Sequence, residues 1–298
     1  MTFIAIIGSI ELGLIYAVMA LGVFLSFRTL NTPDLTVDGS MVTGMATSAI
    51  VCSTGGNPYL ALFLSLIAGC LAGSVTALLN TKLKIEPLLA GILVMLGLYS
   101  VNFKIMGGKA NIALIDSGNI YTSFGDAFPS EYSSLILGLI VLSIVIAALY
   151  YFLKTRLGFA LRATGDNEEM VRASGINSNA MRLMGLAISN GFVALAGGML
   201  SQYQSFTDIS MGVGMVVVGL ASVIIGEVVF GTKSLLRRLI AVSLGAVLYR
   251  MVISFAYYLG MPANDLKLVS AIIVTIALST GILGEKFSLR KKGGVKNA

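Results

Sequence analysis

The chain has 298 residues, of which 56% are hydrophobic and 11% are charged, and it carries a net charge of +6. A soluble domain has roughly one charged residue in four, so this chain has too few ionisable groups to cover a water-exposed surface. Composition therefore excludes a soluble globular protein and predicts an all-α polytopic membrane protein, with one domain over residues 1–298.

Nine apolar segments are candidates for membrane-spanning helices. In chain order they are 3–25, 36–52, 59–80, 88–106, 133–153, 181–203, 214–230, 239–259 and 267–284. The segments at 36–52 and 214–230 are short and flanked by glycine, which indicates broken or re-entrant helices. Non-helical backbone at membrane depth is tolerated only where protein or a water-filled cavity surrounds it.

A weak internal repeat relates the two halves of the chain. LIAGCLAGSVTALL (66–79) and LIAVSLGAVLYRMV (239–252) each follow one of the short glycine-rich segments. In the predicted topology the two copies run in opposite directions, and inverted repeats with interrupted helices are typical of transporters. Two apolar segments can also be alike by chance, and the sequence leaves both interpretations open.

Small residues predict where helices approach closely. They are concentrated in GCLAG (69–73) and ALAGGM (194–199). Small side chains allow close backbone contact between membrane helices, which lack a hydrophobic drive to associate. We therefore expect helix crossings at both stretches.

Basic residues predict the orientation of the chain. If the N-terminus is outside, 16 of the 20 lysines and arginines fall in inside loops or in the tail 285–298. Only Lys104, Lys109 and Lys267 fall on or near the outer face. By the positive-inside rule, the C-terminus is predicted to be cytoplasmic. The membrane topology also explains the net positive charge, which therefore does not indicate nucleic-acid binding.

Residues 162–182, RATGDNEEMVRASGINSNAMR, form a hydrophilic stretch between two apolar segments. Asn167 is a good N-cap, two glutamates follow in the first turn, Arg172 falls in the last turn and Gly175 can end a helix. A two-turn helix at 167–174 is therefore predicted on the cytoplasmic face. From the residues alone, it could lie on lipid headgroups or dock into a groove of a cytoplasmic partner.

A resemblance to a known family bears on that choice. RATGDNEEMVRASGIN, followed by MRLMGLAISNGFVALAGGMLSQYQSF, resembles the coupling-helix region of ABC importer permeases of the branched-chain amino acid and ribose type. TPDLTVDGS (32–40) and VVVGLASVIIGEVVFG (216–231) are similar to a tryptophan/tyrosine-type subfamily that includes uncharacterised importers. The resemblance extends over nearly the whole chain.

The resemblance implies a permease subunit in a bacterial plasma (inner) membrane, with no catalytic activity of its own. Implied partners are an ATP-binding cassette ATPase subunit, an extracytoplasmic solute-binding protein and a second permease copy, with a homodimer favoured over a heterodimer. ATP and Mg²⁺ would be bound by the ATPase and no cofactor by this chain. The implied solute is small, an amino acid and by subfamily an aromatic one. The residues expected to contact the ATPase are Asn167, Glu168, Glu169, Met170, Val171, Arg172, Ala173 and Gly175.

The residues agree that any ATPase must be a separate chain. The phosphate-binding pattern GxxxxGK[ST] is absent. The nearest stretch, GEVVFGTKS (226–234), has an extra residue between Gly231 and Lys233.

Charged residues inside membrane segments are costly and are candidates for function. Glu11 and Arg250 lie in the middle of their segments. They could pair with each other to hold the bundle together, or Arg250 could bind a substrate carboxylate. Asp34 could cap a helix starting near Leu35.

Asp38 and Gly39 are predicted to mark a break in the helix that follows Asp34. Asn190 could bond to a neighbouring helix or face the pathway. The candidate pathway residues are Glu11, Asp38, Gly39, Asn190 and Arg250.

Two other classes of membrane protein are alternatives to an ABC importer permease. An ion-coupled secondary transporter would need membrane-embedded acids in proton-relay positions, and only Glu11 and Asp38 qualify, with no histidine in the chain. A membrane enzyme would need a convergent set of catalytic groups or metal ligands. The two cysteines, Cys52 and Cys70, lie in apolar segments and predict neither a disulfide framework nor a metal site.

Overall fold

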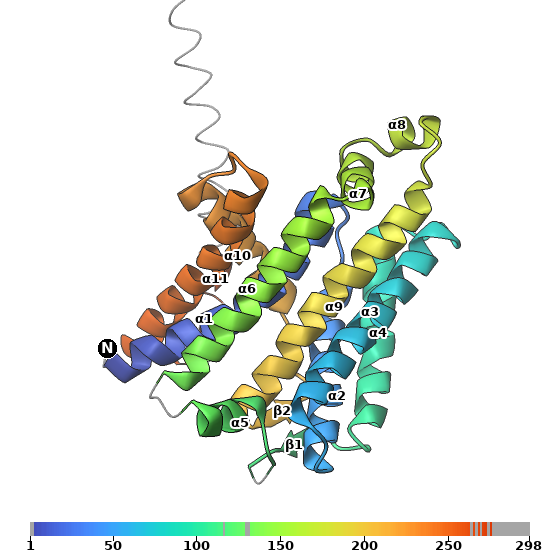
Figure 1. Ribbon diagram of the computed structural model, residues 1–298. Coiled ribbons are helices and arrows are strands. Elements are labelled where there is room, and N and C mark those ends of the chain that lie inside the picture. The colour runs from blue at the N-terminus through green and yellow to red at the C-terminus, as the bar shows by residue number, and fades with distance from the viewer. Residues whose placement is uncertain are drawn as a thin grey trace, which may run out of the picture.

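A computed structural model describes residues 3–115, 117–128 and 132–262, with isolated positions 265, 268, 270–272 and 275. The described chain is a bundle of helices with one short pair of strands at its edge (Figure 1). The helices are α1 (Phe3–Val23), continued by the π-helix η1 (Phe24–Thr29), α2 (Thr36–Ser53), α3 (Pro58–Thr81), α4 (Pro87–Ile105), α5 (Ile120–Ala127), α6 (Ser133–Lys154), α7 (Arg156–Asp166), α8 (Glu168–Ala173), α9 (Ser178–Gln204), α10 (Met215–Phe230) and α11 (Leu235–Tyr258). The strands are β1 (Asn111–Ala113) and β2 (Phe206–Asp208).

Within the described residues, six helices are long and apolar enough to cross a membrane. They are Phe3–Thr29, Pro58–Thr81, Pro87–Ile105, Ser133–Lys154, Ser178–Gln204 and Leu235–Tyr258. The two segments predicted to be short, 36–52 and 214–230, form the helices α2 and α10. The ninth predicted segment, 267–284, and the tail 285–298 lie outside the described residues, isolated positions apart.

The long helices run between two ends of the bundle (Figure 1). One end carries α7 and α8 and is called the α8 end here. The other carries α5, β1 and β2 and is called the β1 end. The chain starts at the β1 end, and η1 reaches the α8 end, where the backbone of Thr29 lies close to Gly165 of α7.

The helices α2 and α10 begin inside the bundle and not at either end. Asp34, which is 1% exposed, accepts a hydrogen bond from the Thr36 N–H at 2.9 Å, so it caps α2 as expected. Its other carboxylate oxygen accepts from the Asn190 amide, halfway along α9. The start of α2 is therefore level with the middle of a full-length membrane helix.

The predicted break of α2 at Asp38 and Gly39 is wrong, since α2 runs without interruption to Ser53. The Asp38 carboxylate accepts N–H groups of α10 and leaves the hydrogen bonds of α2 intact. The missing side chain of Gly39 allows α4 to approach, because a Cβ there would lie 2.9 Å from Leu98 Cδ1.

Close helix crossings occur where small residues predicted them. A Cβ on Gly69 would lie 2.3 Å from the Asn190 carbonyl oxygen, and one on Gly73 would lie 2.2 Å from that of Leu186. Gly197 of α9 approaches α2 in the same way, with Met41 O at 2.1 Å. Glycine thus brings α2 and α3 into backbone contact with α9.

The pairing of the helices follows the pattern of an inverted repeat. Helix α3 packs along α9, and its counterpart α11 packs along α1. Helix α2 packs against α3 and α9, while α10 packs against α11 and α1. Exchanging α1–α2–α3 with α9–α10–α11 preserves every one of these contacts, and it exchanges the similar stretches 66–79 and 239–252.

Four described elements lie outside the sequence predictions. The helices α5 and α7 are short, and β1 pairs with β2 in antiparallel register, Ile112 opposite Thr207. Strands of three residues are too short for a periodic signal, and their pairing joins distant parts of the chain. Thr155 caps helix α7, since its hydroxyl accepts the Gly158 N–H at 3.2 Å.

Candidate functional site

Helix α8 forms where the local sequence predicts it. The Asn167 side chain accepts the Met170 N–H at 3.0 Å, which caps the first turn. Gly175 has φ of +79°, a left-handed conformation that glycine adopts readily, and it ends the helix. These local signals place a short helix at the extremity of the α8 end (Figure 1).

A network of polar side chains ties α8 to the membrane helices. The Glu168 carboxylate forms ion pairs with Arg172 in the same helix, at 2.5 Å, and with Arg182 in α9. Arg182 also donates to Asn80 Oδ1 in α3 at 2.9 Å. Asn80 in turn donates to the Ile85 carbonyl oxygen, at 2.8 Å, just before α4. These contacts connect α8 to α9 and to the α3–α4 turn.

The two apolar residues in the middle of α8 have opposite environments. Val171 is 2% exposed and packs inward, whereas Met170 is 56% exposed. Glu169 and Ala173 are also exposed. One face of α8 is held by the bundle while the other presents an uncovered apolar side chain.

A buried polar cluster surrounds the start of α2. Asn190 donates to Asp34 Oδ2 at 2.7 Å and accepts from the Ser40 hydroxyl at 2.6 Å. The Thr36 hydroxyl, one turn before Ser40, bonds to that of Thr76 in α3. Asn190 is fully buried. Its hydrogen bonds to Asp34 and Ser40 are the interhelical contacts that were one of its two predicted roles.

Asp38 and Gly39 line a cavity of about 210 Å³ between α2, α4 and the loop before α10. Asn102 of α4 lies in its wall and donates to the Gly39 carbonyl oxygen at 3.2 Å. Its Oδ1 is buried without a hydrogen-bond partner among the described residues. Tyr99, one turn earlier, is 58% exposed at the cavity. The sequence did not indicate Asn102 or Tyr99 as site residues, because both lie in a predominantly apolar segment.

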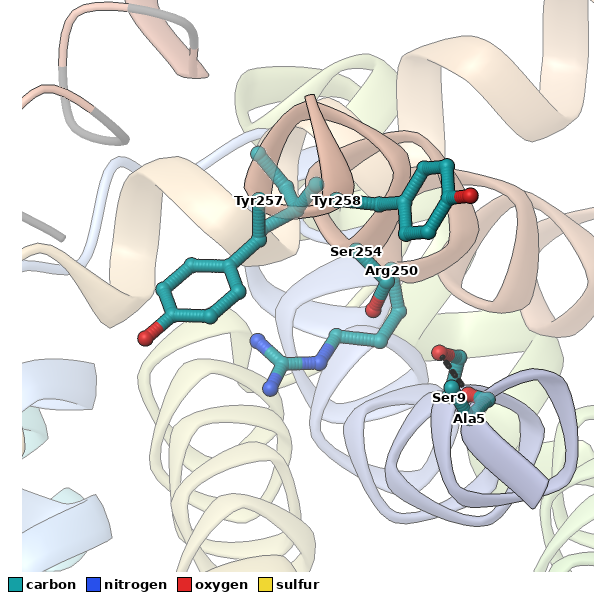
Figure 2. A pocket seen from close by; sticks show the side chains of 7 residues that line it. Ala5, Ser9, Arg250, Ser254, Tyr257 and Tyr258 are labelled. Carbon is teal, nitrogen blue, oxygen red and sulfur yellow. Dashed lines mark hydrogen bonds between the residues drawn. The ribbon is translucent and has the colours of Figure 1, made fainter. Parts of the chain in front are cut away.

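Arg250 lies in a cavity of about 380 Å³ between the start of α1 and the end of α11. Figure 2 shows residues that line it: Arg250, Ser254, Tyr257 and Tyr258 on α11, and Ala5 and Ser9 on α1. The Arg250 guanidinium and the Tyr257 ring extend to the same side in this view, as expected for residues two helical turns apart. Arg250 Nε is buried and has no hydrogen-bond partner among the described residues.

Glu11 and Arg250 form no ion pair in the described part of the chain. Glu11 instead accepts a hydrogen bond from the Tyr203 hydroxyl at 2.8 Å, and the Arg250 guanidinium lies 5.5 Å from the centre of the Tyr16 ring. The interpretation that the two charges hold the bundle together by pairing is therefore not observed. The sequence did not indicate Tyr203 as the partner of Glu11, because a single sequence does not show which residues of different helices lie close together.

Unusually short apolar helices in corresponding positions of the two halves of a membrane protein are typical of transporters. Residues 5–278 match the family described as branched-chain amino acid transport system / permease component, and the chain belongs to this family. It is 41% identical over 286 residues to the tyrosine transport system permease protein of Clostridioides difficile (strain R20291), covering 96% of this chain and 94% of the relative.

Two more distant similarities are found, one in sequence and one in fold. The ribose import permease protein RbsC of Escherichia coli (strain K12) is 25% identical over 265 residues, which is 88% of this chain and 80% of that protein. In fold, the chain is similar to the structure of PsaBC from Streptococcus pneumoniae in complex with Fab. That match has a TM-score of 0.53 and 15% identity, and covers 92% of this chain and 89% of the other.

The chain is thus the permease subunit of an ABC importer, a multi-pass protein of the plasma membrane. Family membership implies an ATPase subunit and a solute-binding protein as partners. The ion-coupled secondary transporter weighed as an alternative is set aside by the family match.

Proposed function

We propose that this permease forms the translocation path for an aromatic amino acid of the tyrosine type and is driven through α8 by a separate ATPase subunit. An extracytoplasmic binding protein delivers the solute. ATP and Mg²⁺ bind to the ATPase, so this chain carries out no catalysis. Two identical copies of the permease act together.

The observation that carries this proposal is the exposed Met170 on an anchored helix. A six-residue helix has too few internal hydrogen bonds to be stable alone. Here Asn167, Glu168 and the buried Val171 hold it in place while Met170 projects outward. A preorganised helix with an uncovered methionine suits docking into a groove of a partner protein. The Glu168–Arg182–Asn80 connection would then transmit movement of the ATPase to the membrane helices.

Charge distribution supports cytoplasmic placement of the α8 end. Arginines and lysines gather there at the ends of η1, α3, α6 and α10 and along α7 and α8, whereas Lys104 and Lys109 lie near the β1 end. The positive-inside rule places the basic end in the cytoplasm and the N-terminus outside. That is the side on which an ATPase would find its nucleotide.

Support for the solute comes from the relative and from the Arg250 cavity. The Clostridioides difficile relative is named as a tyrosine transport permease. A cavity of about 380 Å³ is large enough for one amino acid, since small-molecule sites start at roughly 300 Å³. The Arg250 guanidinium can bind a carboxylate through two parallel hydrogen bonds, and Tyr257 offers an aromatic neighbour. By the proposed orientation, this cavity lies near the outer mouth.

The test is uptake by proteoliposomes that contain the permease with its co-purifying ATPase, supplied with the binding protein. Labelled tyrosine should accumulate with ATP, and unlabelled tyrosine should compete whereas ribose should not. Met170→Asp should abolish most uptake because a charge replaces the docking side chain. Leu83→Asp is the matched control, since Leu83 is 65% exposed at the same end but lies off α8. Equal uptake by Met170→Asp and wild type would reject docking at α8, and ribose competition would reject the amino acid.

A further inference from the structure

A polar cavity of about 450 Å³ lies at the α8 end, between η1, α7 and the α10–α11 turn. It is separate from the Arg250 cavity and from α8. Four cationic side chains line it: Arg28, Arg162, Lys233 and Arg238. Asp166 is the acidic residue in the lining. The cavity is therefore strongly basic.

Two of these four cations share one carboxylate. Glu227 of α10 pairs with Arg28 at 3.0 Å and with Arg238 at 2.8 Å. Arg162 and Lys233 form no ion pair among the described residues. Arg162 Nε is buried and without a hydrogen-bond partner in the described chain. Because an unpaired buried donor is costly, the cavity favours an anion with several acceptor oxygens.

The start of α11 adds to this preference. Ser234 caps the helix through its hydroxyl, which accepts the Arg237 N–H at 3.3 Å, and it lines the cavity beside Lys233. The positive end of a 24-residue helix thus faces the cavity. Lys233 and Ser234 belong to the GEVVFGTKS stretch, which here links two helices and so lacks the strand that precedes a nucleotide-binding loop.

An apolar groove of about 350 Å³ lies along another face of α11 and shares Ser234 with the basic cavity. Leu236, Ile240 and Leu244, spaced four residues apart, line it and are 42%, 43% and 41% exposed. A basic cavity at the end of a membrane helix that exposes apolar side chains matches a molecule with an anionic head and a hydrocarbon tail. Basic pockets between membrane helices on the cytoplasmic side are known to accept such lipid headgroups.

We propose that this cavity binds the phosphate headgroup of an anionic phospholipid. The phosphate oxygens accept from Arg162 and Lys233 and from the first turn of α11. The lipid bridges α7, which leads into α8, to the α10–α11 turn. Anionic lipid is therefore a ligand of the permease that stabilises α7 against the bundle.

The experiment compares lipid binding by the purified, delipidated permease in a neutral detergent. Phosphatidylglycerol is titrated, with bound lipid counted by native mass spectrometry and stability followed by thermal unfolding. Phosphatidylcholine serves as the zwitterionic lipid control. The variant is Arg162→Gln with Lys233→Gln, which leaves the Glu227 pairs intact. Its matched control is Lys82→Gln with Lys84→Gln, two exposed cations at the same end outside the cavity.

We expect phosphatidylglycerol, and not phosphatidylcholine, to raise Tm. The cavity variant should bind it roughly 30-fold more weakly, from about 1 kcal/mol per basic residue, while the control variant binds as wild type. Equal loss in both variants would mean nonspecific attraction and would overturn the site. An equal rise in Tm with inorganic phosphate alone would overturn the lipid as occupant. Normal lipid binding by the cavity variant with loss of the co-purifying ATPase would assign the cavity to that protein instead.

Discussion

The carboxylate of Asp38, in the first turn of α2, accepts a hydrogen bond from the backbone N–H of Val216, in the first turn of α10, at 2.8 Å. Its second oxygen accepts from the Gly214 N–H at 2.9 Å. One side chain thus caps a distant helix by bonding to a residue 178 positions later in the chain. The Asp38 carboxylate therefore joins the starts of α2 and α10. It satisfies N–H groups at the start of α10 that would otherwise have no hydrogen-bond partner away from water.

Replacement of Asp38 should therefore destabilise the permease. Asp38→Ala removes two hydrogen bonds to a charged acceptor, and we expect a loss of about 3 kcal/mol in the free energy of unfolding. Asp38→Asn should lose less because one amide oxygen remains. Thermal unfolding in detergent measures both. The control is Glu86→Gln, since Glu86 precedes α4 without a side-chain capping bond. A Tm for Asp38→Ala as high as that of the control would contradict the capping role.

The ion pair between Glu168 and Arg182 should be needed for coupling. Glu168→Arg should reduce uptake at least several-fold while ATP hydrolysis continues, because α8 loses its connection to α9. Arg182→Glu alone should act in the same direction. The double exchange restores opposite charges at positions 168 and 182 and should recover part of the uptake. The recovery is incomplete because a cation in the first turn of α8 costs about 0.5 kcal/mol and the ion pair with Arg172 stays lost. Uptake and ATPase rates in the same proteoliposomes provide the measurement. No recovery in the double variant would argue that the two residues act separately.

Arg250 should contribute to solute affinity if it binds the carboxylate of the solute. Arg250→Gln should raise the KM for uptake about tenfold or more with a smaller change in kcat, because a bidentate hydrogen bond is lost. Glu11→Gln should act independently, since Glu11 bonds to Tyr203 and not to Arg250. The effects of the two single substitutions should then add in the double variant. Recovery of uptake in the double variant would instead indicate a pair between the two charges.

Gly44 should tolerate no side chain. A Cβ at this position would lie 1.8 Å from the Ala194 carbonyl oxygen, so Gly44→Ala must push α2 away from α9. We expect a loss of about 1–3 kcal/mol, the usual cost of overpacking. Gly97→Ala in α4 is the control, because no atom lies within 4 Å of its added Cβ, and it should stabilise α4 by up to about 1 kcal/mol. Similar Tm values for the two variants would refute the close contact.

Much of the helical framework follows from the sequence by itself. Apolar runs of membrane length locate the six long helices, because a chain in lipid must satisfy its backbone within each segment. The bounds of α8 follow from Asn167 and Gly175, whose effects are confined to adjacent turns. Glycines at 69–73 correctly mark a helix crossing, because only their size matters there.

Only the tertiary structure decided which polar groups meet. The sequence suggested Asp38 as a break in its own helix, yet it caps α10, and it suggested Glu11 beside Arg250, yet Glu11 bonds to Tyr203. The same is true of Arg182 with Asn80 in the connection from α8. A hydrogen bond between distant helices depends on their packing angle and register, which no local pattern records. Local physical chemistry thus determined the helices, and their packing determined the sites.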